Sequence, residues 1–182
     1  MLKLALGTLL AAIAMFAWGF FFYGSKAIDH FGHVTLEQEA VLLEAFKANL
    51  SADAIYILPD ESNGTAEEVM ARAAPGPVAL INYHSGPIPP MATTLIMGFV
   101  HILITAAILA VFMTLIAPAA KTYADRLKVI AVAALAAAVF AHLGNPIWWH
   151  YPWGFSAMAA LYDFVSYVMA GAILAYFVPA RM

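Results

Sequence analysis

Three side chains that can carry charge lie inside long apolar stretches of this sequence: His101, His142 and Asp163. An ionisable side chain is costly to keep in hydrocarbon, so within a membrane helix it usually faces other helices and has a partner. His101 and Asp163 each lie about nine residues from the same end of their stretches, a depth of ~13 Å at 1.5 Å per residue. We therefore predict that His101 and Asp163 form a buried polar pair.

Two further residues are expected to lie near the predicted pair. His142 is near the end of its apolar stretch, a turn or two closer to the membrane surface than the predicted pair. Tyr167 follows Asp163 by four residues and therefore shares its helix face. Both residues are candidates for a ligand or a proton relay.

The polar cluster can be interpreted in three ways, of which two need no metal. In the first, the pair only fixes the register between helices, since an interhelical hydrogen bond in a membrane contributes about 0.6 kcal/mol on average. In the second, the cluster relays protons or contacts a quinone or a lipid headgroup. The second interpretation requires a cavity near Tyr162 and Tyr167.

In the third interpretation, His101, His142 and Asp163 bind haem or a metal such as copper or zinc, with His84 or His150 as a further ligand. Imidazole suits zinc, copper and iron, and a carboxylate can complete such a site. The shallower position of His142 counts against this arrangement. Our first expectation is therefore that the chain holds no cofactor, with haem, copper or zinc, and quinone as alternatives.

An aromatic segment separates the last two apolar stretches. Pro146 and Pro152 are expected to end one helix and to begin the next. Rings with a polar edge are typical of the membrane–water interface, so we expect four of them to anchor the hairpin there. These four residues are Trp148, Trp149, Tyr151 and Trp153.

The composition indicates a membrane protein. Hydrophobic residues make up 64% of the 182 residues and charged residues only 10%, whereas soluble domains carry about 25% charged residues. The absence of cysteine excludes disulfides, thiolate catalysis and iron–sulfur clusters. No basic patch suggests a nucleic-acid partner.

Four stretches are long enough to span a bilayer, which takes about 20 apolar residues. We expect membrane helices over residues 1–24, 93–117, 127–145 and 155–178. The first stretch resembles a signal peptide, with Lys3 at its start and small residues at Ala12 and Ala14. Because it remains apolar to Tyr23, we expect a retained signal-anchor rather than a cleaved leader.

Residues 25–92 are polar and acidic, and their pattern predicts a small αβαβ domain. Thr35 with Gln38, and Thr65 with Glu68, fit capping boxes that begin two helices. Short β-prone runs follow each helix, and the strand–helix–strand part could form a right-handed parallel unit. A two-stranded sheet is only marginally stable alone. This domain is therefore expected to pack against the membrane helices or to accept a strand from a partner.

Basic residues near the ends of spans predict the orientation, because Lys and Arg favour the cytoplasmic side. With four spans, Lys3, the basic loop 118–126 and the C-terminus 179–182 all lie on one side. Both termini are then cytoplasmic. The domain 25–92 and the Trp-rich hairpin 146–154 face the periplasm of a bacterium, and the chain lies in its inner membrane.

The predicted fold is therefore a four-helix transmembrane bundle with a small αβ extracytoplasmic domain between spans one and two. No Gly-rich phosphate loop, GxSxG or HExxH motif is present. We expect a non-catalytic accessory or assembly subunit of a larger membrane complex, which contacts the lipid bilayer and binds other subunits through the periplasmic domain. The alternative is a metal-, haem- or quinone-binding redox or proton-relay protein.

Overall fold

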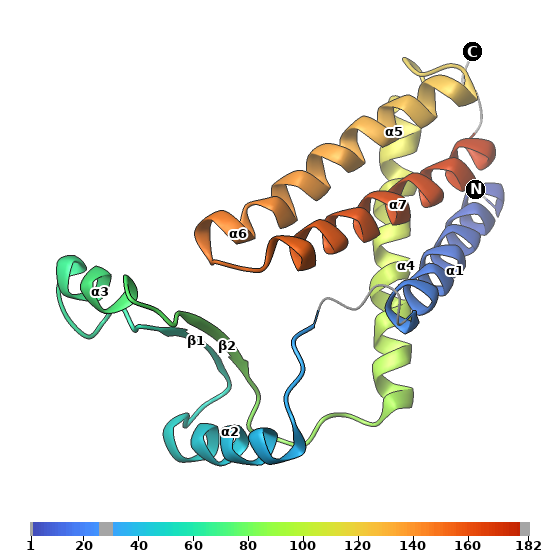
Figure 1. The fold of residues 1–182 in the computed structure, drawn as a ribbon. Coiled ribbons are helices and arrows are strands. Elements are labelled where there is room, and N and C mark those ends of the chain that lie inside the picture. The colour runs from blue at the N-terminus through green and yellow to red at the C-terminus, as the bar shows by residue number, and fades with distance from the viewer. Residues whose placement is uncertain (1, 26–30, 179–182) are drawn as a thin grey trace. The chain divides into compact units, whose positions relative to one another are not determined.

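The structure, a computed structural model, describes residues 2–25 and 31–178. It has four long apolar helical spans, with a small α/β insert between the first and the second (Figure 1). The spans are α1 (Leu2–Gly24), α4 (Met91–Ile116), α5 (Tyr123–Ala138) with its continuation to Trp148, and α7 (Trp153–Phe177). The predicted fold class is confirmed. The predicted C-terminal segment 179–182 lies outside the described residues.

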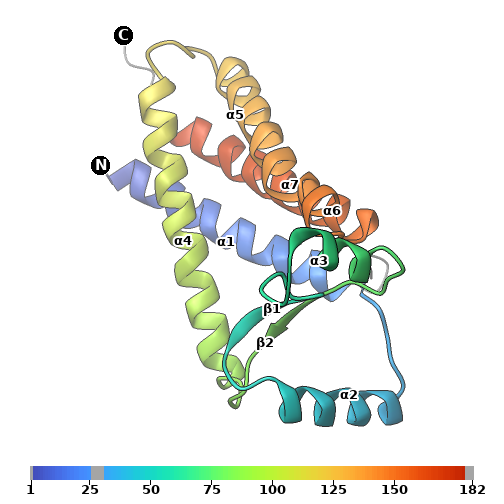
Figure 2. The ribbon, with the colours of Figure 1, turned by 90° about the vertical axis from the view of Figure 1, so that its left-hand side faces the viewer.

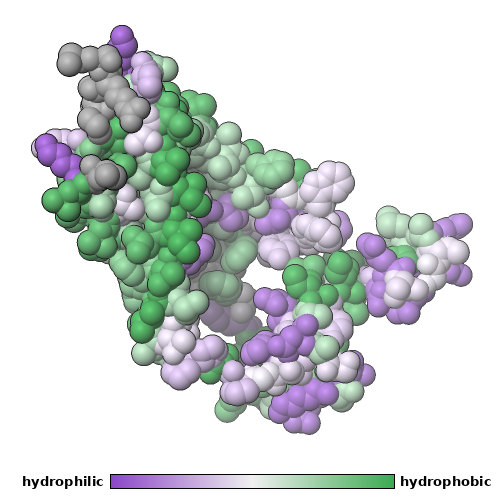
Figure 3. All heavy atoms as spheres, turned by 180° about the vertical axis from the view of Figure 1, so that it is seen from behind, coloured by the Kyte–Doolittle hydropathy of each residue, from purple (hydrophilic) through white to green (hydrophobic). Residues whose placement is uncertain are grey.

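The spans pack mainly around α7. Helices α1 and α5 both lie against α7, whereas α4 packs on α1 and makes a smaller contact with α7 (Figures 1 and 2). Seen from behind, the outer surface of these helices is largely hydrophobic, as contact with lipid requires (Figure 3). Thus α4 and α5 each pack on α7 and make little direct contact with each other.

Glycine allows α7 to approach two of its neighbours closely. A Cβ atom on Gly7 would lie 2.7 Å from the Phe177 side chain, and one on Gly171 would lie 2.6 Å from Ile130. Small residues bring membrane helices into close contact where lipid removes the hydrophobic drive. The α5–α7 contact therefore depends on the missing side chain of Gly171.

Replacing Gly171 by alanine is expected to destabilise the protein by about 1–2 kcal/mol, because overpacking outweighs the gain in helix propensity. The matched control is Gly98→Ala in α4, where the new Cβ would lie 3.8 Å from the Phe16 ring, an ordinary contact. The thermal midpoint in mild detergent should fall for Gly171→Ala and stay level or rise for Gly98→Ala. Equal midpoints for the two variants would contradict the close α5–α7 contact.

Helix α5 begins inside the segment predicted to be a cytoplasmic loop, residues 118–126. Thr122 is its N-cap: the Thr122 Oγ1 accepts a hydrogen bond from the Asp125 amide (3.1 Å) and donates to the Asp125 carboxylate (2.7 Å). Such a cap satisfies an amide at the helix start that has no intrahelical partner. The predicted loop is consequently shorter, and Arg126 belongs to a helix.

Arg126 is buried, with only 3% of its surface exposed. Its Nε donates to the Ala120 carbonyl (3.0 Å) and its Nη1 donates to the carbonyls of Ala175 (3.0 Å) and Val178. The last carbonyls of a helix lack intrahelical partners and carry partial negative charge. Arg126 therefore caps the end of α7 and joins it to the start of α5.

The third span continues further than the sequence predicted. After α5 the chain forms a π-helical segment, η2 (Val139–Leu143), and then a short helix, α6 (Asn145–Trp148). Pro146 lies in the first turn of α6 instead of ending the span, since a proline there loses no intrahelical hydrogen bond. Pro152 is the N-cap of α7, so the connection between the spans is tighter than the predicted hairpin 146–154.

The insert contains α2 (Leu36–Asn49), β1 (Ala54–Leu58), α3 (Ala66–Ala73) and β2 (Ala79–Tyr83). Both predicted capping boxes are confirmed, at Thr35 with Gln38 and at Thr65 with Glu68. The predicted parallel unit is wrong, because β1 and β2 pair antiparallel, with Ala54 opposite Tyr83 and Leu58 opposite Ala79.

Hydrogen bonds near α3 explain the antiparallel pairing. The Arg72 guanidinium donates to the Asn63 carbonyl (2.9 Å), so α3 folds back on the turn that follows β1. The Asp60 carboxylate accepts from both the amide and the hydroxyl of Ser62 in the same turn (2.8 Å each). The chain therefore enters β2 at the end where it left β1, instead of crossing back along the sheet.

A second set of hydrogen bonds closes the other end of the sheet. The Asp53 Oδ1 accepts from the Ser85 amide (2.8 Å) and hydroxyl (2.6 Å), and its Oδ2 is 2.6 Å from the His84 Nδ1. These bonds, chiefly those from Ser85, lower the pKa of the Asp53 carboxyl from 3.8 to about 2. Asp53 thus links the start of β1 to the end of β2.

The lowered pKa predicts how this link responds to acid. The folded pKa of Asp53 lies below its unfolded value, so its stabilisation is complete above about pH 4 and is lost as the pH falls through about 2. The amide proton of Ser85, followed by NMR, should shift with a midpoint near pH 2. The shift should be absent in Asp53→Asn, and a midpoint near pH 4 in the unchanged protein would contradict the prediction.

Candidate functional site

Two ionisable side chains within the membrane spans, those of His142 and Asp163, contact each other. The Nε2 of His142 lies 2.7 Å from the Oδ2 of Asp163, and the two side chains are 23% and 32% exposed. His142 is in η2 and Asp163 is in α7. An N···O distance of 2.7 Å lies at the short end of the range for a hydrogen bond, so the pair joins the third span to the fourth.

The partner of Asp163 is therefore His142 rather than the predicted His101. His101 is exposed on α4, where its carbonyl accepts a hydrogen bond from the Thr105 hydroxyl (3.1 Å). Among residues 2–25 and 31–178, no hydrogen bond or ion pair joins His101 to Asp163. The same ranges contain no group of three His, Asp or Glu side chains that could hold a metal ion, so the three predicted metal ligands do not converge.

His142 continues the packing face of the third span. Ile130, Ala134 and Ala138 are buried at four-residue intervals, and a residue four positions further on lies only about 40° around a regular helix. His142 is the next residue in this series and is half-buried, whereas Ala141 is exposed. The π-helical segment η2 contains both residues.

The sequence suggested that His142 lies closer to the membrane surface than Asp163. The two spans run antiparallel, and this direction lets the two side chains reach the same depth. In every helix the Cα–Cβ bonds tilt toward the N-terminus. His142 therefore leans away from the α6 end of its span, and Asp163 leans toward the start of α7. The two side chains meet between these depths, at 2.7 Å.

Three tyrosines, Tyr23, Tyr162 and Tyr167, lie in the part of the bundle that contains Asp163. Tyr162 packs against α1: its ring centroid is 5.2 Å from that of Phe22 and 4.9 Å from that of Tyr23. This aromatic contact holds the α7 turn that carries Asp163 against α1.

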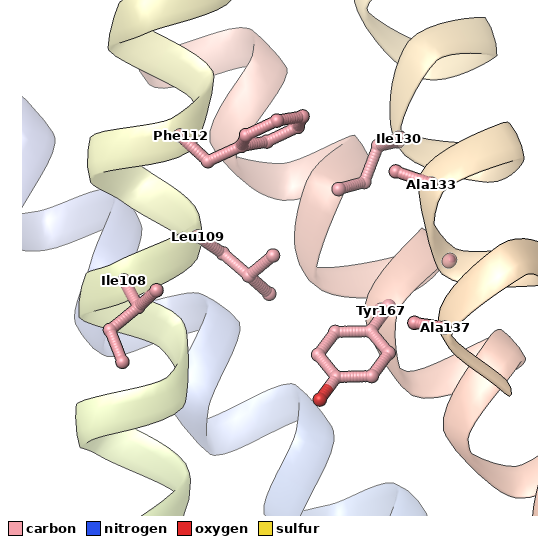
Figure 4. A pocket seen from close by; sticks show the side chains of 8 residues that line it. Ile108, Leu109, Phe112, Ile130, Ala133, Ala137 and Tyr167 are labelled. Carbon is pink, nitrogen blue, oxygen red and sulfur yellow. The ribbon is translucent and has the colours of Figure 1, made fainter. Parts of the chain in front are cut away.

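Tyr167, one turn further along α7, forms part of a cavity. The cavity has a volume of about 250 Å³ and is lined by residues of α4, α5 and α7 (Figure 4). All of its lining residues are apolar except Tyr167. The relay or quinone interpretation required a cavity near Tyr162 and Tyr167, and the cavity lies at Tyr167.

A serine, a histidine and an aspartate also meet in the insert, at Ser85, His84 and Asp53. In a nucleophilic triad the histidine lies between the serine and the aspartate, so that it can remove the serine proton. Here the Ser85 hydroxyl donates directly to Asp53. This cluster therefore ties two strands together and lacks the arrangement of a nucleophile and base.

The predicted interfacial anchors lie at the α6–α7 connection. Trp148 is 75% exposed, Trp149 and Trp153 are also exposed, and Tyr151 is half-buried. Exposed rings at the end of two spans are typical of an aromatic belt. Their role as anchors remains a prediction.

Comparisons with known protein families, with curated proteins and with solved structures give no match. The class of this protein therefore rests on its own features. Four apolar spans and the inserted α/β unit define a four-span integral membrane protein.

Proposed function

We propose that this chain is a non-catalytic accessory or assembly subunit of a larger complex in the bacterial inner membrane, and that it binds its partner through residues 31–88. The observation that carries the proposal is that none of these residues, all of which the structure describes, is buried. Their helices and strands are formed and capped, so the segment is folded without a core of its own.

The insert also exposes large apolar side chains. Leu36 and Ile88 are each more than 80% exposed, and Val41, Ile55 and Met70 are more than 60% exposed. A two-stranded sheet has marginal stability alone, and exposed apolar residues are typical of binding surfaces. Each strand of the β1–β2 sheet has an unpaired outer edge that could accept a partner strand.

A substitution on the exposed sheet tests the proposed interaction. The full-length chain should co-purify with a stoichiometric partner from native membranes in mild detergent, and Ile55→Asp should reduce the amount of that partner at least tenfold, which corresponds to about 1.4 kcal/mol. Glu61→Gln, an exposed polar change in the same insert, is the control. A monomeric chain without a partner, or a partner unaffected by Ile55→Asp, would overturn the proposal.

The proposed orientation places both termini in the cytoplasm and residues 25–92 in the periplasm, which the basic residues Lys3, Lys121 and Lys128 support. Because the sequence has no cysteine, single introduced cysteines can report it. An impermeant maleimide should label Ser62→Cys in intact spheroplasts and Lys121→Cys only after lysis. The reverse pattern would refute the orientation.

A second candidate function has an observation of its own. The paired His142 and Asp163, with tyrosines nearby, form a set of groups that can exchange protons at membrane depth. This favours a proton-relay or quinone-binding protein over the metal- and haem-binding alternatives. Its test is the ligand experiment described below.

A further inference from the structure

The cavity beside Tyr167 follows from how the spans are arranged. Both α4 and α5 pack on α7, and the side chains between them leave a space of about 250 Å³. On the α5 side the wall consists of Ile130 and three alanines, of which Ala133 and Ala137 face Leu109 of α4 across the space (Figure 4). The cavity is partly open to the surroundings of the helices.

The size of the cavity restricts what can occupy it. A helix with side chains is about 10–12 Å wide, so one turn of it needs more than ~400 Å³ and does not fit in 250 Å³. Ligand sites for drug-sized molecules begin at about 300 Å³, so a ligand with a ring and a chain must extend through the open side of the cavity. A single hydrocarbon chain is the ligand component that matches both the size and the apolar wall.

The hydroxyl of Tyr167 requires a hydrogen-bond partner on the ligand. It has no hydrogen-bond partner among the described residues, although its neighbour Tyr162 and the Asp163 carboxylate lie nearby. Polar groups in hydrocarbon need a partner, because no water is present to supply one. In Figure 4 the Tyr167 oxygen lies at the tip of the ring, at one end of the cavity.

The depth and the charge of this end favour an uncharged head group. Tyr167 is ten residues from Phe177, the last residue of α7, which at 1.5 Å per residue is ~15 Å, half of a ~30 Å hydrocarbon layer. None of the residues lining the cavity is charged, so a phosphate would find no counter-ion there. A phospholipid head group cannot reach this depth without a large cost.

We propose that this cavity binds a lipid-soluble quinone, with its isoprenoid chain between α4 and α5 and a ring carbonyl accepting a hydrogen bond from the Tyr167 hydroxyl. This inference rests on the second candidate function and names its ligand and its site, and it is independent of the proposed binding surface on residues 31–88. The quinone lies against the face of α7 that carries Tyr167, one turn from the His142–Asp163 pair.

The test uses the full-length protein in nanodiscs and a short-chain ubiquinone with two isoprene units as the probe. Tyr167→Phe removes only the hydroxyl and should weaken binding about fivefold, the value of one ordinary hydrogen bond. Ala133→Leu fills the cavity and should weaken binding at least tenfold. Ala136→Leu adds the same side chain to an exposed α5 position outside the cavity and should leave binding unchanged.

The results separate the quinone from an ordinary lipid chain. If phospholipid in excess displaces the probe completely, or if Tyr167→Phe binds it as the unchanged protein does, the cavity holds only lipid chains and the proposal is overturned. If Ala133→Leu fails to fold, Tyr167→Phe alone decides the outcome. Loss of binding in Ala136→Leu to the same extent as in Ala133→Leu would also refute the assigned cavity.

Discussion

Replacing His142 by alanine is expected to destabilise the folded protein by about 3 kcal/mol, because the Asp163 carboxylate then loses its partner at membrane depth. The two side chains are 2.7 Å apart and only 23% and 32% exposed, so bulk water cannot readily replace the imidazole. The free energy of unfolding in bicelles or mild detergent measures the effect. His101→Ala is the matched control and should cost less than about 0.5 kcal/mol, as for other exposed positions.

A double-mutant cycle separates the pair from the loss of packing. His142→Ala and Asp163→Ala combined should cost about 1–3 kcal/mol less than the sum of the single changes, since two contacting residues are coupled. Additive effects would mean that the two side chains do not interact in the membrane. If His101→Ala lowered the free energy of unfolding as much as His142→Ala does, His101 would be the partner of Asp163, as the sequence suggested.

Replacing Arg126 by alanine is expected to destabilise the protein by about 3–4 kcal/mol. Hydrogen bonds to a charged group contribute about 1.5–3 kcal/mol, and Arg126 donates to three carbonyls from two segments while almost completely buried. Its loss leaves the carbonyls of Ala175 and Val178 without this donor at the end of α7. Hydrogen exchange at the last turn of α7 should increase together with the fall in the free energy of unfolding.

Arg126→Lys keeps the charge and is expected to recover less than half of that loss, because an ammonium lacks the planar fork that reaches several carbonyls at once. Lys128→Ala is the control: Lys128 is exposed and lies 3.9 Å from Asp125, a contact worth less than about 1 kcal/mol. If Arg126→Lys behaves as the unchanged protein does, charge rather than geometry would account for the role of Arg126.

The sequence predicted the features that depend on local pattern. Four apolar stretches gave the four spans, and the spacing of Thr35 with Gln38 gave a helix start with the expected cap. Such features need only neighbouring residues, so hydrophobic length and capping chemistry are sufficient. The cost of an ionisable group in hydrocarbon also predicted that Asp163 has a partner, although the residue chosen, His101, was wrong.

The identity of that partner could not be predicted. Depth was counted from Cα positions along the sequence, which favoured His101, whereas the side chains of His142 and Asp163 lean toward each other from antiparallel helices and meet at 2.7 Å. Similarly, the role of Arg126 depends on carbonyls about 50 residues away in the sequence, and charge alone made it look like a loop residue. The antiparallel direction of β2 goes together with a contact between Arg72 of α3 and the turn before it, which sequence spacing does not reveal.

The pairing of His142 with Asp163 is tested most directly by solid-state NMR in lipid bilayers, with ¹⁵N-histidine and ¹³C-aspartate labels. Two His–Asp correlations are expected within the described residues, one from His84 to Asp53 (2.6 Å), which serves as an internal reference, and one from His142 to Asp163 (2.7 Å). The second should vanish in His142→Gln and persist in His101→Gln. Its loss in His101→Gln and survival in His142→Gln would contradict the arrangement on which the intramembrane site depends.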